Sequence, residues 1–353
     1  MLVYEHPLYR ADIKTVAEMN LPWEKLNGTN LMISGATGLL GSFLIDVIMY
    51  KNMKDELKCT VYALGRNKGK ARNRFSYCIN SPYFHFFSCD VNQPLSLERV
   101  SQVDYVIHMA SNTHPVAYAT DPIGTIMTNI YGLKNMLDFS EAHNNKRFAF
   151  ASSNEIYGEN RGDVDLFDER YCGYIDCNTM RAGYPESKRC GESLCQAYIS
   201  QKNMDIVIPR FTRSYGPNLL KSDTKALSQF LKKAVDGKDI VLKSRGTQYY
   251  SYTYMADAIS GLLTVLLKGK KGAAYNIADE KSDIHLKDLA ALIAETVDKK
   301  VVFDIPNQVE SAGFSKATKA RLNSTKLQSL GWTAQYDIKN GIKRTIQILK
   351  ECK

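Results

Sequence analysis

The stretch LMISGATGLLGSFLIDVIMY, residues 31–50, decides the fold. Its opening apolar residues predict a buried strand, and the apolar run after the glycines predicts a buried helix. Glycines at 35, 38 and 41 allow a tight turn and close approach of the backbone to a pyrophosphate, which would face the helix N-terminus. A strand before and a helix after are the context in which a glycine triplet indicates a dinucleotide-binding turn. We expect cofactor contacts from Gly35, Thr37, Gly38, Leu39, Leu40 and Gly41.

Composition limits the class of protein and its partners. The chain has 353 residues, of which 44% are hydrophobic and 24% charged, as in soluble globular proteins. The net charge of +9 favours anionic small molecules, and no motif for reading a nucleic-acid groove or stacking single-stranded bases accompanies it. Residues 31–50 are almost free of charge and about as long as a membrane span, but three glycines and Asp46 interrupt them. We therefore predict neither a nucleic-acid partner nor a membrane partner.

Cysteine and histidine usage bears on compartment and metal binding. The eight cysteines form no C-x-x-C pair, and the six histidines have no metal-ligand spacing. The chain begins without a charged-then-apolar signal segment. We therefore predict buried, reduced thiols, a cytoplasmic protein and no metal site.

Further apolar segments repeat the alternation of strand and helix. Strands are predicted at residues 60–64, 105–108, 148–151 and 206–208, with helical stretches between them. Such βαβ units predict an α/β fold with a Rossmann-type, doubly wound parallel sheet. Beyond Pro217 the alternation loosens into a smaller C-terminal α/β substrate lobe, with helical patterns at 225–235, 257–267 and 286–297.

These patterns divide the chain into parts. Residues 1–28 are expected to be an N-terminal appendage, and residues 29–210 an NAD(P)-binding Rossmann domain. A return segment near 246–278 is expected to rejoin that domain, and residues 211–353 are expected to form mainly the substrate-binding lobe.

The end of the second strand bears on the choice of dinucleotide. An acidic residue there usually binds the adenosine ribose of NAD, but this chain has Gly65 followed by Arg66. Further basic residues follow at 68, 70, 72 and 74. Cations attract the 2′-phosphate of NADP, which an acid would repel, so the sequence favours NADP(H). A solvated, basic start of a helix explains the same residues, and NAD stays open as the cofactor.

Tyr184 and Lys188 form a Y-x-x-x-K pair. On a helix these positions share one face, and a nearby ammonium lowers the pKa of a phenol. The tyrosine would then exchange a proton with a sugar hydroxyl while a nicotinamide exchanges the hydride. Tyr50 and Lys54 match the same pattern, but they fall at the end of the first helix, far from the expected nicotinamide. Tyr184 instead follows the strand whose end carries Ser153.

With these residues the chain resembles the extended short-chain dehydrogenase/reductase family, which includes sugar-nucleotide epimerases, 4,6-dehydratases and UDP-glucuronate decarboxylases. The resemblance runs from about residue 30 to about residue 332 and depends on many short matches in the family's order. Besides the glycine turn and the catalytic residues, the matches are Asp90-Val91, His108-Met109-Ala110-Ser111, Thr128-Asn129, Arg210, Tyr215-Gly216-Pro217, Tyr254, Asp257, Tyr275-Asn276 and Leu330-Gly331-Trp332.

The resemblance implies roles for individual residues. Ser153 would hydrogen-bond the reacting sugar oxygen, Tyr184 would be the acid/base, and Lys188 would hold the nicotinamide ribose. It also implies a homodimer formed through a helix bundle. The cofactor contacts expected outside the glycine turn are Arg66, Asp90, Val91, Ala110, Ser111, Asn129, Tyr184 and Lys188.

Glu155 and its neighbours indicate a branch of the family. Plain epimerases lack an acid two residues after the serine, whereas dehydratases and decarboxylases carry a glutamate there, as this chain does. An elimination or decarboxylation needs an acid/base beside the neighbouring carbon, so we take Asn154 and Glu155 as candidate catalytic residues. Dehydratases have an aspartate where this chain has Asn154. The stretches 110–115 and 178–189 most resemble UDP-glucuronate decarboxylases, in which Arg181 has a counterpart. A solvated loop carboxylate is the alternative explanation of Glu155.

Two positions depart from the family pattern at the substrate end. Arg213 stands where the family has an asparagine, and Tyr250 where it has an arginine near the diphosphate and the reacting sugar. Arg213 and Arg245 are candidates for the missing cation, because a desolvated diphosphate needs paired charge. The candidate substrate-binding residues are Thr113, His114, Arg181, Arg213, Tyr215, Arg245 and Tyr250.

Three functions are compatible with these residues. The first is internal redox on a nucleotide-activated sugar, as in epimerases, dehydratases or decarboxylases, for precursors of surface polysaccharides. The second is an NADPH-dependent reductase that converts a nucleotide-linked ketose, for instance a CDP-linked one, to an alditol. The third is a dinucleotide-binding protein without catalysis, which the joint presence of Ser153, Tyr184 and Lys188 disfavours.

Overall fold

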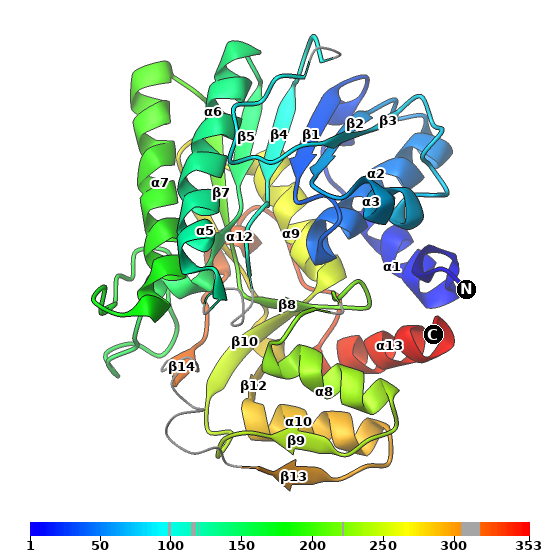
Figure 1. Ribbon diagram of the computed structural model, residues 1–353, viewed down its shortest axis with the longest axis vertical. Coiled ribbons are helices and arrows are strands. Elements are labelled where there is room, and N and C mark those ends of the chain that lie inside the picture. Colours follow the sequence, from blue (N-terminus) through cyan, green and yellow to red (C-terminus); the bar gives the residue numbers. More distant parts are fainter. Residues whose placement is uncertain (98–99, 114–117, 119, 221, 305–317) are drawn as a thin grey trace.

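The computed structural model describes residues 1–97, 100–113, 118, 120–220, 222–304 and 318–353 (Figure 1). Its larger part contains a parallel sheet in which seven strands follow the order β3-β2-β1-β4-β5-β7-β11, with the short β6 (Ser152–Ser153) also paired to β7. The chain starts at β1, builds one edge, and then returns to build the other, which is a doubly wound order. The strands are β1 (Asn30–Ser34), β2 (Thr60–Gly65), β3 (Phe84–Ser88), β4 (Tyr105–His108), β5 (Arg147–Phe150), β7 (Ile206–Phe211) and β11 (Ala274–Ile277).

Helices cover both faces of this sheet, because its strands are apolar on both sides. In β1, Leu31 and Ile33 belong to one hydrophobic core cluster, whereas Met32 belongs to the other. The prediction of a Rossmann-type α/β fold is therefore confirmed. The first cluster includes residues of α2 (Leu39–Asp55) and α9 (Met255–Lys268), and the second includes residues of α6 (Leu133–Ala142) and α7 (Gly183–Lys202).

The five strands predicted from apolar segments all lie in this sheet, but the apolar pattern does not predict β3. β3 has the sequence FHFFS and lies at the edge of the sheet, where only Phe84 of its residues is buried. An edge strand need not be apolar on both faces. It therefore lacks the continuous apolar run that marks a central parallel strand.

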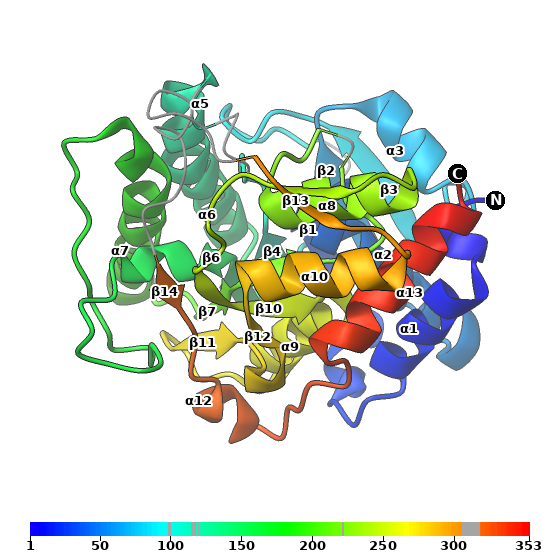
Figure 2. The ribbon, with the colours of Figure 1, turned by 90° about the horizontal axis from the view of Figure 1, so that it is seen from below.

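The smaller lobe lies below the main sheet in Figure 1 and is seen from below in Figure 2. Its sheet has the order β12-β10-β14, with β8 also paired to β10, and β9 pairs separately with β13. The helices predicted near 225–235, 257–267 and 286–297 are confirmed as α8, α9 and α10. The elements of this lobe are β8 (Arg213–Tyr215), β9 (Ile240–Leu242), β10 (Tyr249–Tyr254), β12 (Asp283–His285), β13 (Val301–Phe303), β14 (Lys319–Ala320), α8 (Ala226–Val235), α10 (Leu286–Thr296) and α13 (Ile338–Glu351).

The segment expected to return to the main domain divides between the two sheets. α9 packs on the main sheet and β11 extends it beyond β7, whereas β10 belongs to the sheet of the smaller lobe. Thus the chain crosses back to the main part at the start of α9. The segment of the smaller lobe between β7 and α9 is therefore joined to the main part at both of its ends.

The N-terminal segment, expected to be an appendage, is packed into the molecule. α1 (Pro7–Ala17) packs against α2 and α9, and its Tyr9 side chain donates a 2.5 Å hydrogen bond to the buried Asp46 carboxylate of α2. The equally buried Asp12 accepts hydrogen bonds from Tyr254 of β10 at 2.6 Å and from Arg344 of α13 at 2.5 Å. Figure 1 and Figure 2 show both termini on the same side of the molecule. A short amphipathic pattern could not reveal these tertiary partners.

Two further expectations can be compared with the structure. All eight cysteines are free, but the prediction that they are buried is wrong for Cys172, Cys177 and Cys190, which are exposed. Cysteine spacing carries no information on depth, which explains the error. Residues 31–50 form β1, the glycine turn and most of α2, and within the described residues no helix combines the length and apolar character needed to cross a bilayer.

Candidate active site

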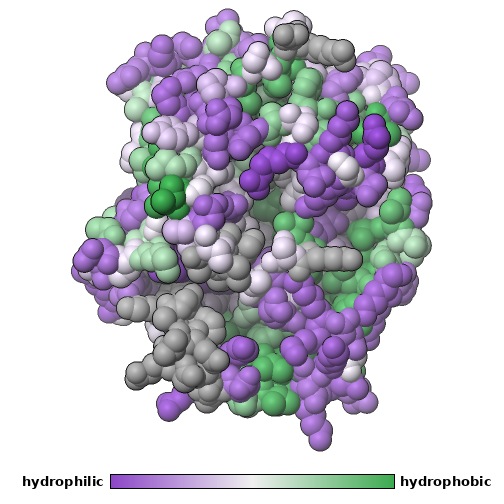
Figure 3. Space-filling model, viewed as in Figure 1, coloured by the Kyte–Doolittle hydropathy of each residue, from purple (hydrophilic) through white to green (hydrophobic). Residues whose placement is uncertain are grey.

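A cavity of about 890 Å³ lies between the main sheet and the smaller lobe. Its lining includes the glycine turn after β1, residues at the carboxyl ends of the main-sheet strands, and residues of β8, α8 and β9. Figure 3 shows this face of the molecule hollowed at mid-height, with hydrophilic side chains around the hollow. Ligands of open α/β sheets bind outside the carboxyl ends of the strands, so this cavity is the candidate active site.

The glycine turn has room for a ligand because side chains are excluded from it. Gly35 has a φ of +72°, and a Cβ added there would lie 2.9 Å from the carbonyl carbon of Met109. A Cβ at Gly41 would lie only 2.4 Å from the carbonyl oxygen of Gly35. The turn therefore packs tightly behind the N-terminus of α2, and it fits the phosphates of a dinucleotide. All six residues expected to contact the cofactor here line the cavity, namely Gly35, Thr37, Gly38, Leu39, Leu40 and Gly41.

Most of the other expected cofactor residues line the same cavity. Apart from Tyr184 and Lys188, which lie on α7, they follow β2, β3 and β4, whose carboxyl ends meet along one edge of the sheet. Beside Arg66 lies Lys70, whose pKa is lowered by burial. The lining residues of this group are Arg66, Asp90, Val91, Ala110, Ser111, Tyr184 and Lys188.

Asn129 is fully buried and is not among the described residues that line the cavity. It lies on the π-helical turn η3 (Thr128–Gly132). Its side-chain oxygen accepts a hydrogen bond from Ser111 Oγ at 2.8 Å, and its amide nitrogen donates one to Ser187 Oγ at 2.9 Å. Asn129 therefore connects the segment after β4 to α7, the helix that carries Tyr184 and Lys188.

Tyr184 and Lys188 lie one turn apart on α7, and both side chains are buried. Lys188 Nζ donates a 2.8 Å hydrogen bond to the carbonyl oxygen of Ala151 and lies 6.0 Å from the centre of the Tyr184 ring. The alternative pair, Tyr50 and Lys54, is at the end of α2 and is not among the described lining residues. The structure thus places the first pair, and not the second, at the cavity.

Burial shifts the pKa of each group in the direction that favours its neutral form. Burial lowers the pKa of Lys188 to about 7, against the opposing effects of Cys195 and Glu192. Burial raises the pKa of Tyr184, and the negative charge of Glu155 raises it further, while hydrogen bonds with Ser153 and Ser111 oppose the shift. Tyr184 therefore holds its proton at neutral pH. The expected lowering of the phenol pKa by Lys188 is wrong, because burial favours the neutral form of both groups.

Ser153 ends β6 and caps the 3-10 turn η4 (Asn154–Tyr157), where its hydroxyl oxygen accepts a hydrogen bond from the Glu155 backbone N–H at 3.3 Å. Asn154 and Glu155 line the cavity beside it. The Glu155 carboxylate forms an ion pair with Arg181 at 2.8 Å. Glu155 is thus a paired carboxylate at the cavity wall, and Arg181 contacts it from the segment before α7.

Tyr118 is a lining residue that the sequence does not predict. Its ring stacks on the Tyr184 ring with 4.9 Å between ring centres. The Arg181 guanidinium lies 4.9 Å from the centre of the Tyr118 ring. Tyr118 lies in a stretch without apolar periodicity, and no local motif distinguishes it from the other tyrosines. Only the fold brings it onto Tyr184.

The substrate end of the cavity contains a stacked arginine. The Arg213 guanidinium lies 3.4 Å from the centre of the Tyr250 ring, and both residues line the cavity. Arg213 Nη1 is buried and has no hydrogen-bond partner within the part of the chain that the structure describes. A buried guanidinium N–H without a partner is costly, which points to an anionic or carbonyl oxygen of a ligand as its partner.

The remaining expected substrate residues divide into two groups. Thr113, Arg181 and Tyr215 line the cavity, although the Tyr215 hydroxyl is buried and contacts the Ile338 carbonyl oxygen at 3.4 Å. Arg245 is exposed and is not among the described lining residues, although Ser244 and Gln248 of the same loop line the cavity. His114 lies outside the described residues. Three cations that the motifs do not predict also line this end, namely Lys225, Lys233 and Lys243.

Taken together, the doubly wound sheet and the glycine turn define a dinucleotide-binding α/β protein, in which Ser153, Tyr184 and Lys188 line the same cavity. Residues 31–278 match the NAD dependent epimerase/dehydratase family, and the chain belongs to this family.

Curated relatives agree with this assignment, and a solved structure shares the fold. UDP-glucuronic acid decarboxylase 5 of Arabidopsis thaliana is 27% identical over 312 residues, which cover 88% of this chain and 86% of that protein. UDP-glucuronic acid decarboxylase 1 of Xenopus tropicalis is 27% identical over 321 residues, covering 91% and 72%. The dTDP-glucose 4,6-dehydratase DesIV of Streptomyces venezuelae, with NAD bound, shares the fold with a TM-score of 0.78 at 20% identity, covering 92% and 97%.

Proposed function

We propose that the protein is an enzyme that acts on a nucleotide-activated sugar through internal redox at carbon 4, in the synthesis of surface polysaccharide precursors. The observation that carries this proposal is the gathering of Ser153, Tyr184, Lys188 and Glu155 in the cavity that also contains the glycine turn. A protein that only binds a dinucleotide has no need of an acid/base group there. The family match and the decarboxylase relatives support the same chemistry.

The residues of the chain would divide the work of proton transfer and positioning. The nicotinamide ring supplies the hydride chemistry when the cofactor is bound. Tyr184, which keeps its proton at neutral pH, donates it to a keto oxygen that also accepts a hydrogen bond from Ser153, and takes a proton back in the reverse direction. Lys188 would hold a ribose hydroxyl and, when protonated, would supply positive charge one helical turn from the phenol.

Decarboxylation is the branch that Glu155 and Arg181 favour, and UDP-glucuronate is the first substrate to test. A ketone at carbon 4 is β to the carboxylate on carbon 5. The bond between carbon 5 and the carboxylate then breaks, its electrons move toward the ketone, and carbon dioxide leaves. Carbon 5 must afterwards receive a proton from water, and the Glu155 carboxylate, which Arg181 holds in place, is the candidate that orients this water molecule.

A substrate panel tests the proposal. Purified protein is mixed with UDP-, dTDP- and CDP-linked sugars, with catalytic NAD or stoichiometric NADPH, and products are followed by mass, carbon dioxide release and nicotinamide absorbance. We expect conversion without net change in cofactor, with carbon dioxide released from UDP-glucuronate. No conversion of any sugar, with Tyr184 intact, would overturn the proposal.

The second candidate is an NADPH-dependent reductase of a nucleotide-linked ketose. It is favoured by Arg66 and Lys70, which line the cavity after β2 and suit the 2′-phosphate of NADP. The matched family is described as NAD dependent, which supports NAD instead. Stoichiometric loss of NADPH in the same panel would favour the reductase, and equal use of both cofactors would leave Arg66 without a selective role.

Three further features complete the proposal. Residues 29–210 with the return segment near 246–278 bind the cofactor, and residues 211–353 bind mainly the substrate. The protein forms a homodimer through the helices beside α7, where Ile123, Tyr131 and Met180 are exposed. It works in the cytoplasm, as its free thiols suggest. Light scattering tests the dimer, and a monomer at micromolar concentration would contradict it.

A further inference from the structure

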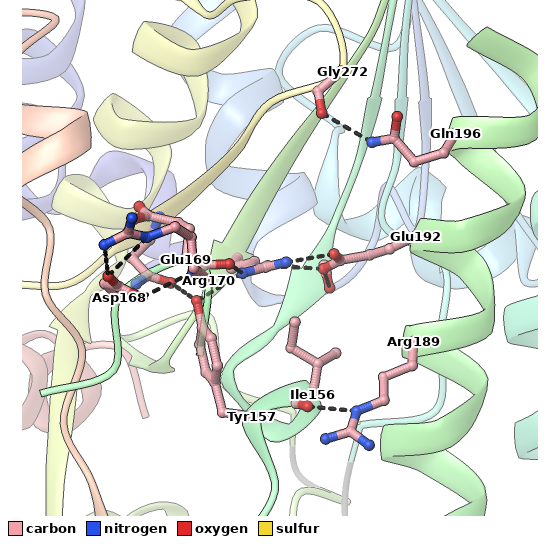
Figure 4. Close-up of polar contacts among 12 residues, drawn as sticks. Ile156, Tyr157, Asp168, Glu169, Arg170, Arg189, Glu192, Gln196 and Gly272 are labelled. Atoms are coloured by element: carbon pink, nitrogen blue, oxygen red, sulfur yellow. Dashed lines mark hydrogen bonds and ion pairs between the residues drawn. The ribbon is translucent and has the colours of Figure 1, made fainter. Parts of the chain in front are cut away.

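Polar side chains of α7 anchor this helix to the main sheet just beyond Lys188. Tyr184, Lys188 and Glu192 are spaced four residues apart, so they share one face of the helix. The two carboxylate oxygens of Glu192 accept hydrogen bonds from Arg210 Nε at 2.9 Å and Nη2 at 2.6 Å. Figure 4 shows the Glu192 side chain extending from α7 toward the sheet.

The same carboxylate is connected directly to the segment that carries Ser153. Ser152 Oγ donates a 2.5 Å hydrogen bond to Glu192 Oε1. Ser152 lies opposite Arg210 in the pairing of β6 with β7, and Ser153 is the next residue along β6. A shift of Glu192 would therefore move the helix that carries Tyr184 relative to the Ser153 hydroxyl.

Arg210 extends the network to the other end of the same segment. Its Nη1 donates a 2.9 Å hydrogen bond to the hydroxyl of Tyr157, the last residue of η4, and Tyr157 in turn donates one to Asn276 Oδ1 at 2.6 Å. Arg189 of α7 adds a 2.7 Å hydrogen bond to the carbonyl oxygen of Ile156, as Figure 4 shows. The segment from Ser152 to Tyr157 is thus held to α7 at both ends.

Stability alone does not explain a charged pair at this place. Arg210 is 8% exposed, and the Glu192 side chain is 14% exposed. The desolvation of two buried charges offsets most of their attraction, and apolar residues of similar size often stabilise a fold equally well. A bidentate Arg–carboxylate pair, however, constrains geometry in a way that apolar contacts cannot. We infer that Glu192 and Arg210 are positioning residues, which hold α7 against β6 and β7 so that Tyr184 and Lys188 meet Ser153.

The charge of Glu192 has a second consequence, at Lys188. Burial lowers the pKa of Lys188, and Glu192 opposes this shift together with Cys195, while Tyr184 on α7 and His108 on β4 are the other titratable groups beside it. Burial raises the pKa of the Cys195 thiol, so Glu192 provides the negative charge at neutral pH. Removing that charge should lower the pKa of Lys188 further.

The test compares Glu192→Gln with Glu186→Gln, the same charge change on the same helix. Glu186 pairs with Arg189 Nη1 at 3.3 Å, whereas the Arg189 contact to Ile156 uses Nε, and no hydrogen bond joins Glu186 to β6 within the described residues. For Glu192→Gln we expect kcat to fall about 10-fold to 100-fold with KM nearly unchanged. The alkaline limb of the pH profile should move to lower pH by about half a unit or more, and so should the pH dependence of NADH binding measured by fluorescence. Glu186→Gln should match the wild type in all three measurements.

Ser152→Ala separates the effect of helix position from the effect of the Glu192 charge. It removes one hydrogen bond to Glu192 and keeps both charged groups, Glu192 and Arg210. It should lower kcat about 3-fold to 10-fold without moving either pH profile, and it serves if Glu192→Gln does not fold in a thermal melt. Wild-type kcat and unshifted pH profiles in the folded variants would overturn the inference. The inference rests on the proposed function, whose failure is distinguishable: wild-type protein without turnover on the substrate panel refutes the function, whereas the NADH-binding measurements still test Glu192.

Discussion

The two ends of the cavity are built in different ways. At the cofactor end, one continuous stretch around Gly35 and Gly41 supplies backbone groups, and space exists because no side chain fits there. At the substrate end, Tyr118, Arg181 and Arg213 come from separate segments and act through their side chains. A site made of backbone geometry can be recognised from local sequence. A site made of side chains from distant segments depends on how the whole chain folds. The predictions below test this division.

The largest expected effect is at the junction of the two ends. Tyr184→Phe should fold normally and bind the dinucleotide, because the ring and its stacking on Tyr118 remain, but kcat should fall about 100-fold or more through loss of the proton donor. Steady-state kinetics and NADH fluorescence measure the two properties. Tyr50→Phe, in the other Y-x-x-x-K match, is the control and should keep wild-type turnover. Near-normal kcat in Tyr184→Phe would show that Tyr184 is not the acid/base.

Disturbing the backbone should affect cofactor binding first. The Cβ of Gly41→Ala would meet the Gly35 carbonyl oxygen at 2.4 Å, so the turn must shift. We expect the Kd for NADH to rise about 30-fold and the free energy of unfolding to fall by about 1–3 kcal/mol. Gly69→Ala, whose Cβ would make only an ordinary 3.5 Å contact with the Asn67 side chain, is the control. Isothermal titration and chemical unfolding provide the measurements, and unchanged NADH affinity in Gly41→Ala would contradict the assigned turn.

Disturbing a side chain at the other end should affect the sugar nucleotide alone. Arg213→Met removes a guanidinium whose Nη1 has no protein partner among the described residues, so KM for the nucleotide sugar should rise about 10-fold while the Kd for NADH stays within about twofold. Arg245→Met, at an exposed position outside the described lining, should leave both constants unchanged. If Arg245→Met raises KM and Arg213→Met does not, the missing cation of the family pattern has been assigned to the wrong arginine.

The smallest effect concerns the choice between the two cofactors. Arg66→Asp places an acid after β2 and should weaken NADPH binding about 10-fold relative to NADH if the protein prefers NADP, and less if it prefers NAD. Arg72→Asp, on an exposed part of α3 (Lys68–Arg74), controls for the change in net charge. Fluorescence titrations with both nucleotides measure the ratio. An equal loss for both nucleotides would dismiss a 2′-phosphate contact.

Sequence patterns were informative where a local rule governs the structure. The central strands are apolar on both faces and the helices are periodic, so their existence and order could be predicted, whereas the half-exposed edge strand β3 could not. Spacing and position along the chain predicted that Ser153, Tyr184 and Lys188 lie together, and the structure places all three at the cavity. The sequence analysis missed Tyr118 and left open whether Arg213 or Arg245 supplies the missing cation. Aromatic and basic residues occur throughout the chain, and only their three-dimensional neighbours distinguish them.

By itself, the sequence determined the individual central strands, the glycine turn and the helical spacing of the phenol and the ammonium, since each depends on residues within a few positions of one another. The tertiary structure alone decided that residues 1–28 pack on α2, that Arg213 stacks on Tyr250 while Arg245 faces solvent, and that Glu192 reaches Ser152 and Arg210. These contacts join residues tens of positions apart. Their geometry is set by the packing of whole elements, which no short window of sequence contains.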